Sequence, residues 1–137
     1  MTSDPSKTNT AVISVGSNIR PDEHIARART EICRRHGMIA ESRFVVTEPV
    51  GDPNQPAFTN GAWRIRTAMD EEALRGWLHA LEEKLGRVRT ANRNGPRTID
   101  LDLAVWNGRI VHKDVHSRDF VKQAVLEVEP DLADQLK

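Results

Sequence analysis

Runs of apolar residues divide the first part of this chain into a strand and a helix. Residues 11–15 (Ala-Val-Ile-Ser-Val) form a short β-branched run, and Gly16-Ser17-Asn18 after it has the composition of a turn. In residues 21–36 the apolar positions recur with helical spacing, and Pro21 and Gly37 mark the two boundaries. The pattern predicts a strand that leads through a loop into an amphipathic helix.

Two further strand-forming segments lie on either side of a proline-rich stretch. Residues 44–47 (Phe-Val-Val-Thr) and the weakly alternating residues 58–67 predict strands that pair as a hairpin. Residues 48–56 between them contain three prolines and one glycine, so we expect a long and partly rigid loop at the end of this hairpin.

The clearest helical pattern follows Asp70, which has a side chain suited to an N-cap. Its apolar positions keep the 3.6-residue period up to Gly86: Leu74, Trp77, Leu78, Leu81 and Leu85. Residues 98–106 predict another strand, and Asn107-Gly108 predicts a tight turn into a short returning strand at residues 109–111. The order βαββαβ indicates an α+β, ferredoxin-like fold: an antiparallel sheet with helices packed on one face, plus a short extra hairpin strand.

Composition narrows the cellular setting and the possible partners. The 137 residues suit one domain, which we expect to span residues 11–137 after a flexible polar tail at residues 1–10. Lys plus Arg and Asp plus Glu are 20 each, so we expect no nucleic-acid or membrane partner. With Cys33 as its single cysteine and nothing at its start that resembles a signal peptide, the chain is expected in the cytoplasm. We also expect a monomer or a weak homodimer.

Two acidic residues interrupt the strand predicted at residues 98–106. Side chains alternate along a strand, so Asp100 and Asp102 share one face and Ile99, Leu101 and Leu103 the other. Positions two apart are roughly 6.5 to 7 Å apart at the backbone, which is close enough for both carboxylates to converge on hard metal ions. Mg²⁺ is held in this way, by one or two carboxylates together with substrate phosphates. Taken alone, such a pair is more often the polar face of a half-exposed strand.

An arginine-rich segment directly before this strand favours the metal interpretation. It contains Arg87, Arg89, Arg93 and Arg97 and no acidic residue. Arginine binds phosphate through two parallel hydrogen bonds, and enzymes that transfer phosphoryl groups commonly combine arginines with Mg²⁺. Solvated arginines on a surface turn are the alternative. Neither a P-loop nor a Rossmann glycine motif occurs, so any phosphates would be held by side chains.

Residues 11–130 resemble the 6-hydroxymethyl-7,8-dihydropterin pyrophosphokinase family. The most specific match is RNGPRTIDLDL at residues 93–103, preceded by Leu81-Glu82 and by GRVR at residues 86–89. GSN at residues 16–18, TEPVG at residues 47–51 and QPAFTN at residues 55–60 resemble the start and the pterin-binding loop of the family.

The resemblance implies transfer of pyrophosphate from ATP to the hydroxymethyl pterin, giving AMP, in folate biosynthesis. It implies that Asp100 and Asp102 bind two Mg²⁺ ions. It also implies that these two aspartates, Arg87 and Arg97 are the catalytic residues. The residues implied for ATP are Arg87, Arg89, Arg97, Arg118 and His116. For the pterin, it implies backbone groups of Thr47 and Val50, the side chain of Asn60, and the rings of Phe58 and Phe120 on the two sides of the ligand.

The segment at residues 112–120 departs from the family pattern, because it is several residues shorter and lacks the usual prolines. His116 is a candidate for the ATP-contacting histidine of the family, although it is closer to Arg118 in the sequence than the family pattern has it. His112 is an equally good candidate, and a surface histidine with no role is the alternative for either. A divergent relative that binds pterin or nucleotide without efficient transfer is therefore the alternative function. An unrelated Mg²⁺-dependent phosphohydrolase ranks last.

Overall fold

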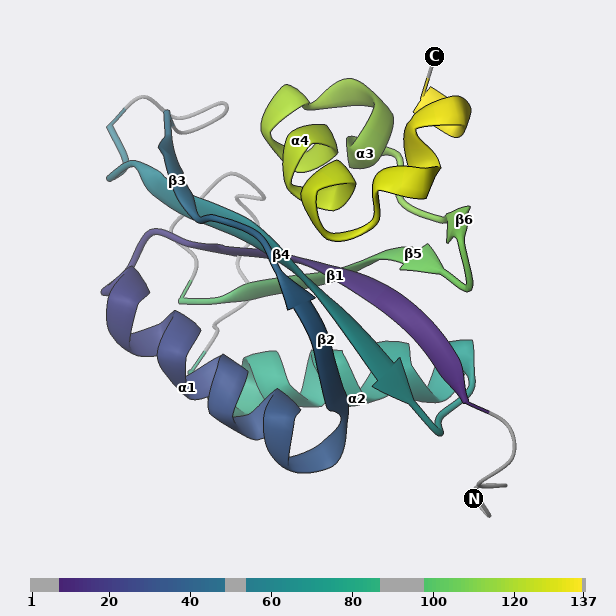
Figure 1. The fold of residues 1–137 in the computed structure, drawn as a ribbon. Coiled ribbons are helices and arrows are strands. Elements are labelled where there is room, and N and C mark those ends of the chain that lie inside the picture. The colour runs from purple at the N-terminus through teal and green to yellow at the C-terminus, as the bar shows by residue number, and fades with distance from the viewer. Residues whose placement is uncertain (1–7, 49–53, 87–97, 137) are drawn as a thin grey trace.

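Six β-strands form the centre of the molecule (Figure 1). The computed structural model describes residues 8–48, 54–86 and 98–136. All the strand pairs are antiparallel, and the order across the sheet is β2-β4-β1-β5-β6, with β3 also paired to β4. The strands are β1 (Asn9–Ser17), β2 (Gly37–Glu41), β3 (Val45–Thr47), β4 (Phe58–Thr67), β5 (Asp100–Trp106) and β6 (Arg109–Ile110).

Two long helices cover one face of this sheet, as Figure 1 shows: α1 (Pro21–Arg35) and α2 (Glu71–Lys84). Their predicted starts are confirmed. Pro21 opens α1, where its missing N–H costs no hydrogen bond, and the Asp70 carboxylate accepts a hydrogen bond of 2.8 Å from the Ala73 N–H of α2. The element order along the chain confirms the predicted ferredoxin-like fold, with one additional strand, β2, that the sequence analysis did not predict.

The core on the α1/α2 side, which we call the packed face, is built mainly from apolar side chains. Ile13 and Val15 of β1, Trp63 and Ile65 of β4, and Leu101 and Leu103 of β5 all lie in it. Helices α1 and α2 close it with side chains at helical spacing: Ala28, Ile32, Leu74, Leu78, Leu81 and Leu85.

The opposite face carries a second set of helices, which the sequence analysis left unassigned. They are α3 (Asp114–Ser117), α4 (Asp119–Val128) and the 3₁₀ helix η1 (Pro130–Leu136). Val121 and Val125 of α4 pack with Val12 of β1 and Ala62 of β4. The expectation of helices on one face thus holds for α1 and α2, and the C-terminal segment adds helices on the other.

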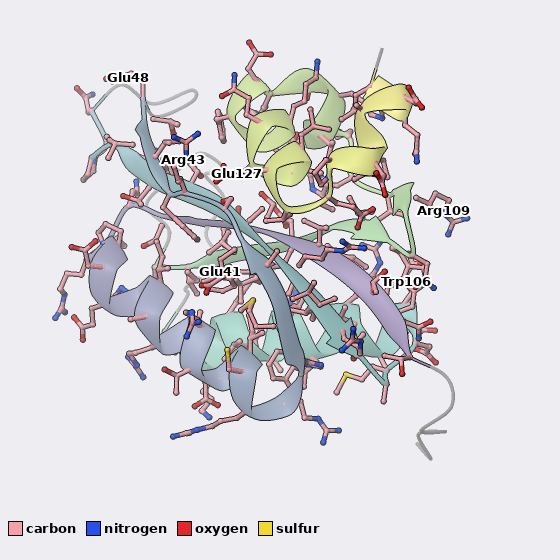
Figure 2. All side chains as sticks on the ribbon, viewed as in Figure 1. Glu41, Arg43, Glu48, Trp106, Arg109 and Glu127 are labelled. Carbon is pink, nitrogen blue, oxygen red and sulfur yellow. The ribbon has the colours of Figure 1, made fainter. Side chains whose placement is uncertain are left out.

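Two ion pairs tie α4 and its C-terminal end to the sheet. Figure 2 shows Arg43, after β2, close to Glu127 of α4, and Arg43 Nε lies 3.5 Å from Glu127 Oε1. Arg64 Nε of β4 lies 3.0 Å from Oε1 of Glu129, which is buried. The second pair connects β4 to Glu129, the residue that directly follows α4.

Two boundaries differ from the predictions. β1 begins at Asn9, so the predicted flexible tail at residues 1–10 extends too far. The Thr10 N–H donates to Asn107 Oδ1 at 2.9 Å, and Asn107 Nδ2 donates to Asn9 Oδ1 at 3.0 Å, which fixes this end of the strand. Within residues 8–48, 54–86 and 98–136, none of the helices has both the length and the apolar character needed to cross a membrane.

The pairing of β1 with β5 contains a β-bulge. Ile13 is opposite Leu103, whereas Val12 is opposite Val105, so Ala104 is an extra residue on β5. The bulge reverses the side on which later residues point: Ala104 and Val105 both pack on the α4 side, and Trp106 packs against the packed face.

Candidate active site

Three neighbouring strands bring polar residues into one row on the face opposite α1 and α2. Gly16 of β1 is opposite Asn60 of β4 on one side and Asp100 of β5 on the other. Asp102 lies beside Ser14 in the next row. Directly opposite residues of an antiparallel pair point to the same face. The predicted alternation is therefore confirmed, since Leu101 and Leu103 are buried in the packed face while both aspartates are half-exposed.

Gly16 provides the space in which the Asn60 side chain lies. A Cβ atom at Gly16 would be 2.7 Å from Asn60 Oδ1, which is closer than van der Waals contact allows. Asn60 Nδ2 donates a hydrogen bond to Thr47 Oγ1 of β3. The carboxamide of β4 therefore lies between its two neighbouring strands: Gly16 of β1 leaves room for its oxygen, and Thr47 of β3 accepts a hydrogen bond from its nitrogen.

A cleft of about 340 Å³ opens above this row. Its floor is the sheet, one wall comes from β3 and β4, and the other wall comes from α3 and the start of α4. Phe58 and Phe120 belong to opposite walls and are both half-buried. The cleft is lined by Ser14, Gly16, Thr47, Glu48, Phe58, Asn60, Asp100, Asp102, Lys113, Asp114, Arg118, Phe120 and Val121.

A second cavity, the groove, lies between β5 and α2 and has a volume of about 250 Å³. Its lining residues are Arg75, Leu78, His79, Glu82, Asp100, Leu101, Asp102, Leu103 and His112. Asp100 and Asp102 line both the groove and the cleft. The aspartate pair therefore lies where two separate ligands could meet.

Glu82 fixes the strand that carries this pair. The residue is only 3% exposed, and its Oε2 accepts a hydrogen bond of 2.7 Å from the Leu101 N–H. Burying a carboxylate is costly unless it is hydrogen-bonded. Glu82 appeared in the sequence analysis only as part of a motif, but its acidic side chain within an apolar helix face was a usable signal of a structural or functional role.

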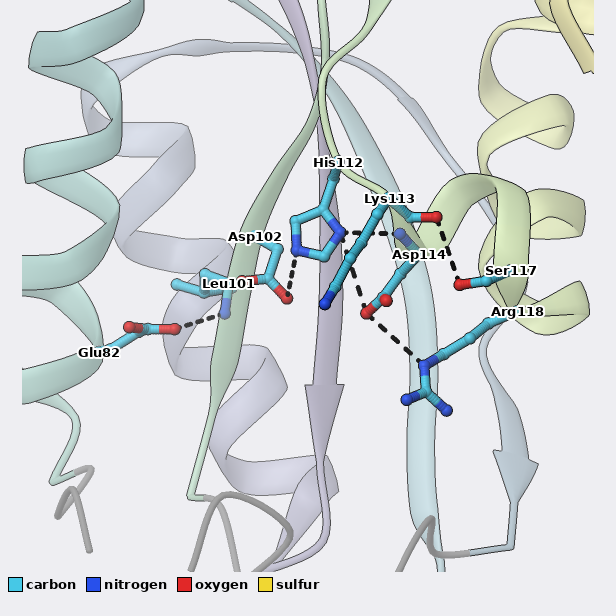
Figure 3. Close-up of polar contacts among 8 residues, drawn as sticks. All are labelled: Glu82, Leu101, Asp102, His112, Lys113, Asp114, Ser117 and Arg118. Atoms are coloured by element: carbon cyan, nitrogen blue, oxygen red, sulfur yellow. Dashed lines mark hydrogen bonds and ion pairs between the residues drawn. The ribbon is translucent and has the colours of Figure 1, made fainter. Parts of the chain in front are cut away.

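A chain of polar contacts joins the groove to the far wall of the cleft (Figure 3). His112 Nε2 lies 3.9 Å from Asp102 Oδ2, and His112 Nδ1 lies 3.9 Å from Asp114 Oδ2. Asp114 Oδ2 also lies 3.6 Å from Arg118 Nε. The Asp114 backbone N–H donates to His112 Nδ1 at 3.1 Å, so in the neutral ring the proton is assigned to Nε2, toward Asp102.

The structure brings together most of the predicted site residues that it describes. Thr47, Phe58, Asn60, Arg118 and Phe120 line the cleft with the two aspartates. Val50, Arg87, Arg89 and Arg97 lie outside the described residues.

The two candidate histidines are placed differently. His112 lines the groove beside Asp102, whereas His116 is exposed and lines neither cavity. Lys113 and Asp114 line the cleft as well, and the sequence analysis gave neither of them a role. Their charge, shortly after the strand predicted at residues 109–111, was the only signal for them.

Comparison with known proteins identifies the family. A family model for 7,8-dihydro-6-hydroxymethylpterin-pyrophosphokinase matches residues 12–130. The chain is 32% identical over 135 residues to the 2-amino-4-hydroxy-6-hydroxymethyldihydropteridine pyrophosphokinase of Haemophilus influenzae, covering 90% of this chain and 83% of that one. It is 31% identical over 131 residues to the protein of that name from Pseudomonas aeruginosa, covering 88% and 80%. The chain belongs to the 7,8-dihydro-6-hydroxymethylpterin pyrophosphokinase family.

Proposed function

We propose that this chain transfers the β,γ-diphosphoryl group of ATP to 6-hydroxymethyl-7,8-dihydropterin in folate biosynthesis. The products are the pterin diphosphate and AMP. The observation that carries the proposal is that Asp100 and Asp102 line both the cleft and the groove. A transfer reaction needs two ligands held with their reacting atoms adjacent, and this pair stands at the junction of two cavities.

The cleft suits the pterin. Phe58 and Phe120, on opposite walls, can contact the two faces of a flat ring, which is a favourable arrangement for aromatic groups. The Asn60 carboxamide offers a donor and an acceptor to the polar edge of such a ring. Its hydrogen bond to Thr47 and its close fit over Gly16 fix its direction before the ligand arrives.

Because the cleft is the proposed pterin site, we propose that the nucleotide binds in the groove. It is open on the outer side of β5 and has polar side chains at its rim, among them Arg75 and His79. His112, beside Asp102, is the histidine that this placement favours for ATP, in preference to His116. Arg87, Arg89 and Arg97 remain predicted phosphate contacts, together with Arg118 in the cleft.

The donor set fits Mg²⁺ held jointly by protein and phosphate. The two aspartates offer hard oxygen ligands, which Mg²⁺ prefers, and the ion is usually bound by one or two carboxylates plus substrate phosphates. Within the part of the chain that the structure describes, no group of three or more His, Cys, Asp and Glu side chains could hold a metal ion. Asp100 and Asp102 would hold Mg²⁺ together with ATP, and the ion would neutralise the phosphates and orient them for in-line displacement.

The bond changes require orientation more than a strong base. The hydroxymethyl oxygen of the pterin forms a bond to the β-phosphorus, and the bond from this phosphorus to the α,β-bridging oxygen breaks. AMP leaves with the bridging oxygen, and the hydroxyl proton passes to water. The residues of the cleft orient the acceptor, and the cations around the aspartates stabilise the charge on the transferred group.

The test is to incubate the chain with Mg²⁺, ATP and the hydroxymethyl dihydropterin and to measure nucleotides by chromatography. AMP and pterin diphosphate are expected in equal amounts, with no AMP when the pterin is omitted. Formation of ADP, or no nucleotide product, would contradict the proposal. Pterin binding in calorimetry without AMP would support the alternative of a binding protein, which the short segment at residues 112–120 favours.

A further inference from the structure

Two cationic side chains, Lys113 and Arg118, line the α3–α4 wall of the cleft. Lys113 directly precedes α3, and its carbonyl oxygen accepts hydrogen bonds from the N–H of His116 at 3.0 Å and of Ser117 at 3.3 Å. Arg118 joins α3 to α4, and its carbonyl oxygen accepts from the Lys122 N–H at 3.0 Å. Helix ends therefore fix the backbone of both residues, although their side chains are long.

The two cations differ in their contacts with the acidic residues around them. Lys113 makes no ion pair with any residue in the described segments of the chain, even though it shares the cleft with three aspartates. Arg118 contacts Asp114 through Nε at 3.6 Å, as Figure 3 shows. This contact leaves the terminal amino groups of the guanidinium able to donate to a ligand.

Lys113 lines one of the two cavities and not the other. Lys113 lines the cleft with Asn60, Phe58 and Phe120, and it does not line the groove. In the proposed reaction the transferred diphosphoryl group ends on the pterin, in the cleft, whereas the α-phosphate leaves with AMP. A cation in the cleft can contact the diphosphoryl group both during its transfer from ATP and after it is bound to the pterin.

We infer that Lys113 and Arg118 form a diphosphate-binding pair that holds the transferred group and retains the pterin diphosphate after AMP leaves. The inference rests on the proposed function and names a ligand contact, Lys113, beyond the site residues predicted from the sequence. Asp114 is a positioning residue in this arrangement, because it holds Arg118 against the wall. Ammonium and guanidinium donors to phosphate oxygens are among the stronger hydrogen bonds in proteins.

The test compares Lys113→Met with Lys113→Arg and with Lys122→Met, a control on α4 that lines neither cavity. Calorimetry would measure the Kd of inorganic pyrophosphate with Mg²⁺ and the Kd of the unphosphorylated hydroxymethyl pterin. We expect Lys113→Met to raise the Kd of pyrophosphate about tenfold, the effect of one charge-assisted hydrogen bond. Pterin affinity is expected to stay within about twofold, and Lys113→Arg and Lys122→Met are expected to bind pyrophosphate nearly as the wild type does.

Unchanged pyrophosphate affinity in Lys113→Met would overturn the inference, as would a wild-type chain that binds no pyrophosphate. An equal loss of pterin affinity would also overturn it, because the substitution would then have damaged the whole cleft. The wild-type AMP assay separates this result from the proposed function. If the wild type forms no AMP but Lys113→Met still loses pyrophosphate affinity, the reaction is refuted and the anion-binding pair stands.

Discussion

The two faces of the sheet are built from the same strands but are closed in different ways. On the packed face, α1 and α2 cover the central strands β1, β4 and β5 with apolar side chains. On the opposite face, α4 covers only part of the sheet, and the rest forms the cleft with Asn60 and the two aspartates. We infer that the two faces have different roles. Substitutions on the packed face should change the free energy of unfolding, and substitutions in the cleft should change ligand binding or turnover.

The largest effect is expected at the aspartates of the cleft. Asp100→Asn or Asp102→Asn should lower the rate of AMP formation by about 10³-fold or more, because a metal clamp contributes several kcal/mol to the transition state. Pterin affinity and the free energy of unfolding should change little, since both side chains are half-exposed. Asp131→Asn, an exposed position on η1 outside both cavities, is the matched control. Activity within tenfold of wild type in either cleft variant would refute the metal role.

A large effect on stability is expected at His36, which lies at the edge of the packed face and is only 8% exposed. Its Nδ1 lies 3.0 Å from Thr67 Oγ1, and its ring meets the Trp77 ring edge-on at 4.5 Å. Burial, with a smaller contribution from Arg35, lowers the pKa of His36 to about 4.

Between pH 6.5 and 4 the unfolded chain therefore binds a proton at His36 that the folded chain does not bind. Stability is complete above pH 6.5 and falls as the pH is lowered, by about 3 kcal/mol at pH 4. Urea denaturation at a series of pH values would measure this slope. His36→Gln should reduce the slope without changing pterin affinity, and an unchanged slope would show that His36 is not its source.

Gly61 offers a smaller stability test on the packed face. It is opposite Val15, and a Cβ atom at Gly61 would lie 2.6 Å from the Phe44 ring. Gly61→Ala should therefore lower the free energy of unfolding by roughly 1 to 3 kcal/mol through overpacking. At Gly37 the nearest contact of an added Cβ would be an ordinary 3.7 Å, so Gly37→Ala is the control. A stable Gly61→Ala variant with weakened pterin binding would contradict the division between the faces.

The smallest effect is expected at Gly16, the neighbouring glycine in the cleft. An alanine there would place its Cβ 2.7 Å from Asn60 Oδ1, so the carboxamide must leave the position from which we propose that it contacts the pterin. We expect the Kd of the pterin to rise about tenfold, equivalent to about 1.4 kcal/mol of binding free energy. Calorimetry measures this change, and thermal unfolding should show almost none. Normal pterin affinity in Gly16→Ala would remove Asn60 from the binding site.

Features set by local rules were predictable from the sequence. The cap at Asp70 depends only on the first turn of α2, and the turn at Asn107-Gly108 depends on two residues that both have positive φ. The shared face of Asp100 and Asp102 follows from strand alternation, which is intact up to Leu103.

Features that depend on distant contacts were not predictable in the same way. Val121, Val125 and Val128 have helical spacing, but their burial requires Val12 and Ala62 on strands far away in the sequence. The choice between His112 and His116 also depended on packing. Val115 of α3 is fully buried, and the short helix turns the next residue, His116, toward solvent while His112 stays beside Asp102.

The extra residue at Ala104 separates two parts of β5 that would otherwise share one register. Up to Leu103 the strand presents acids to the cleft, and beyond the bulge it presents apolar residues to α4. A change in length within the β5–β6 hairpin could then be absorbed at the bulge without moving the aspartates. The end of the strand that carries Asp100 and Asp102 is in this sense separated from changes at its other end.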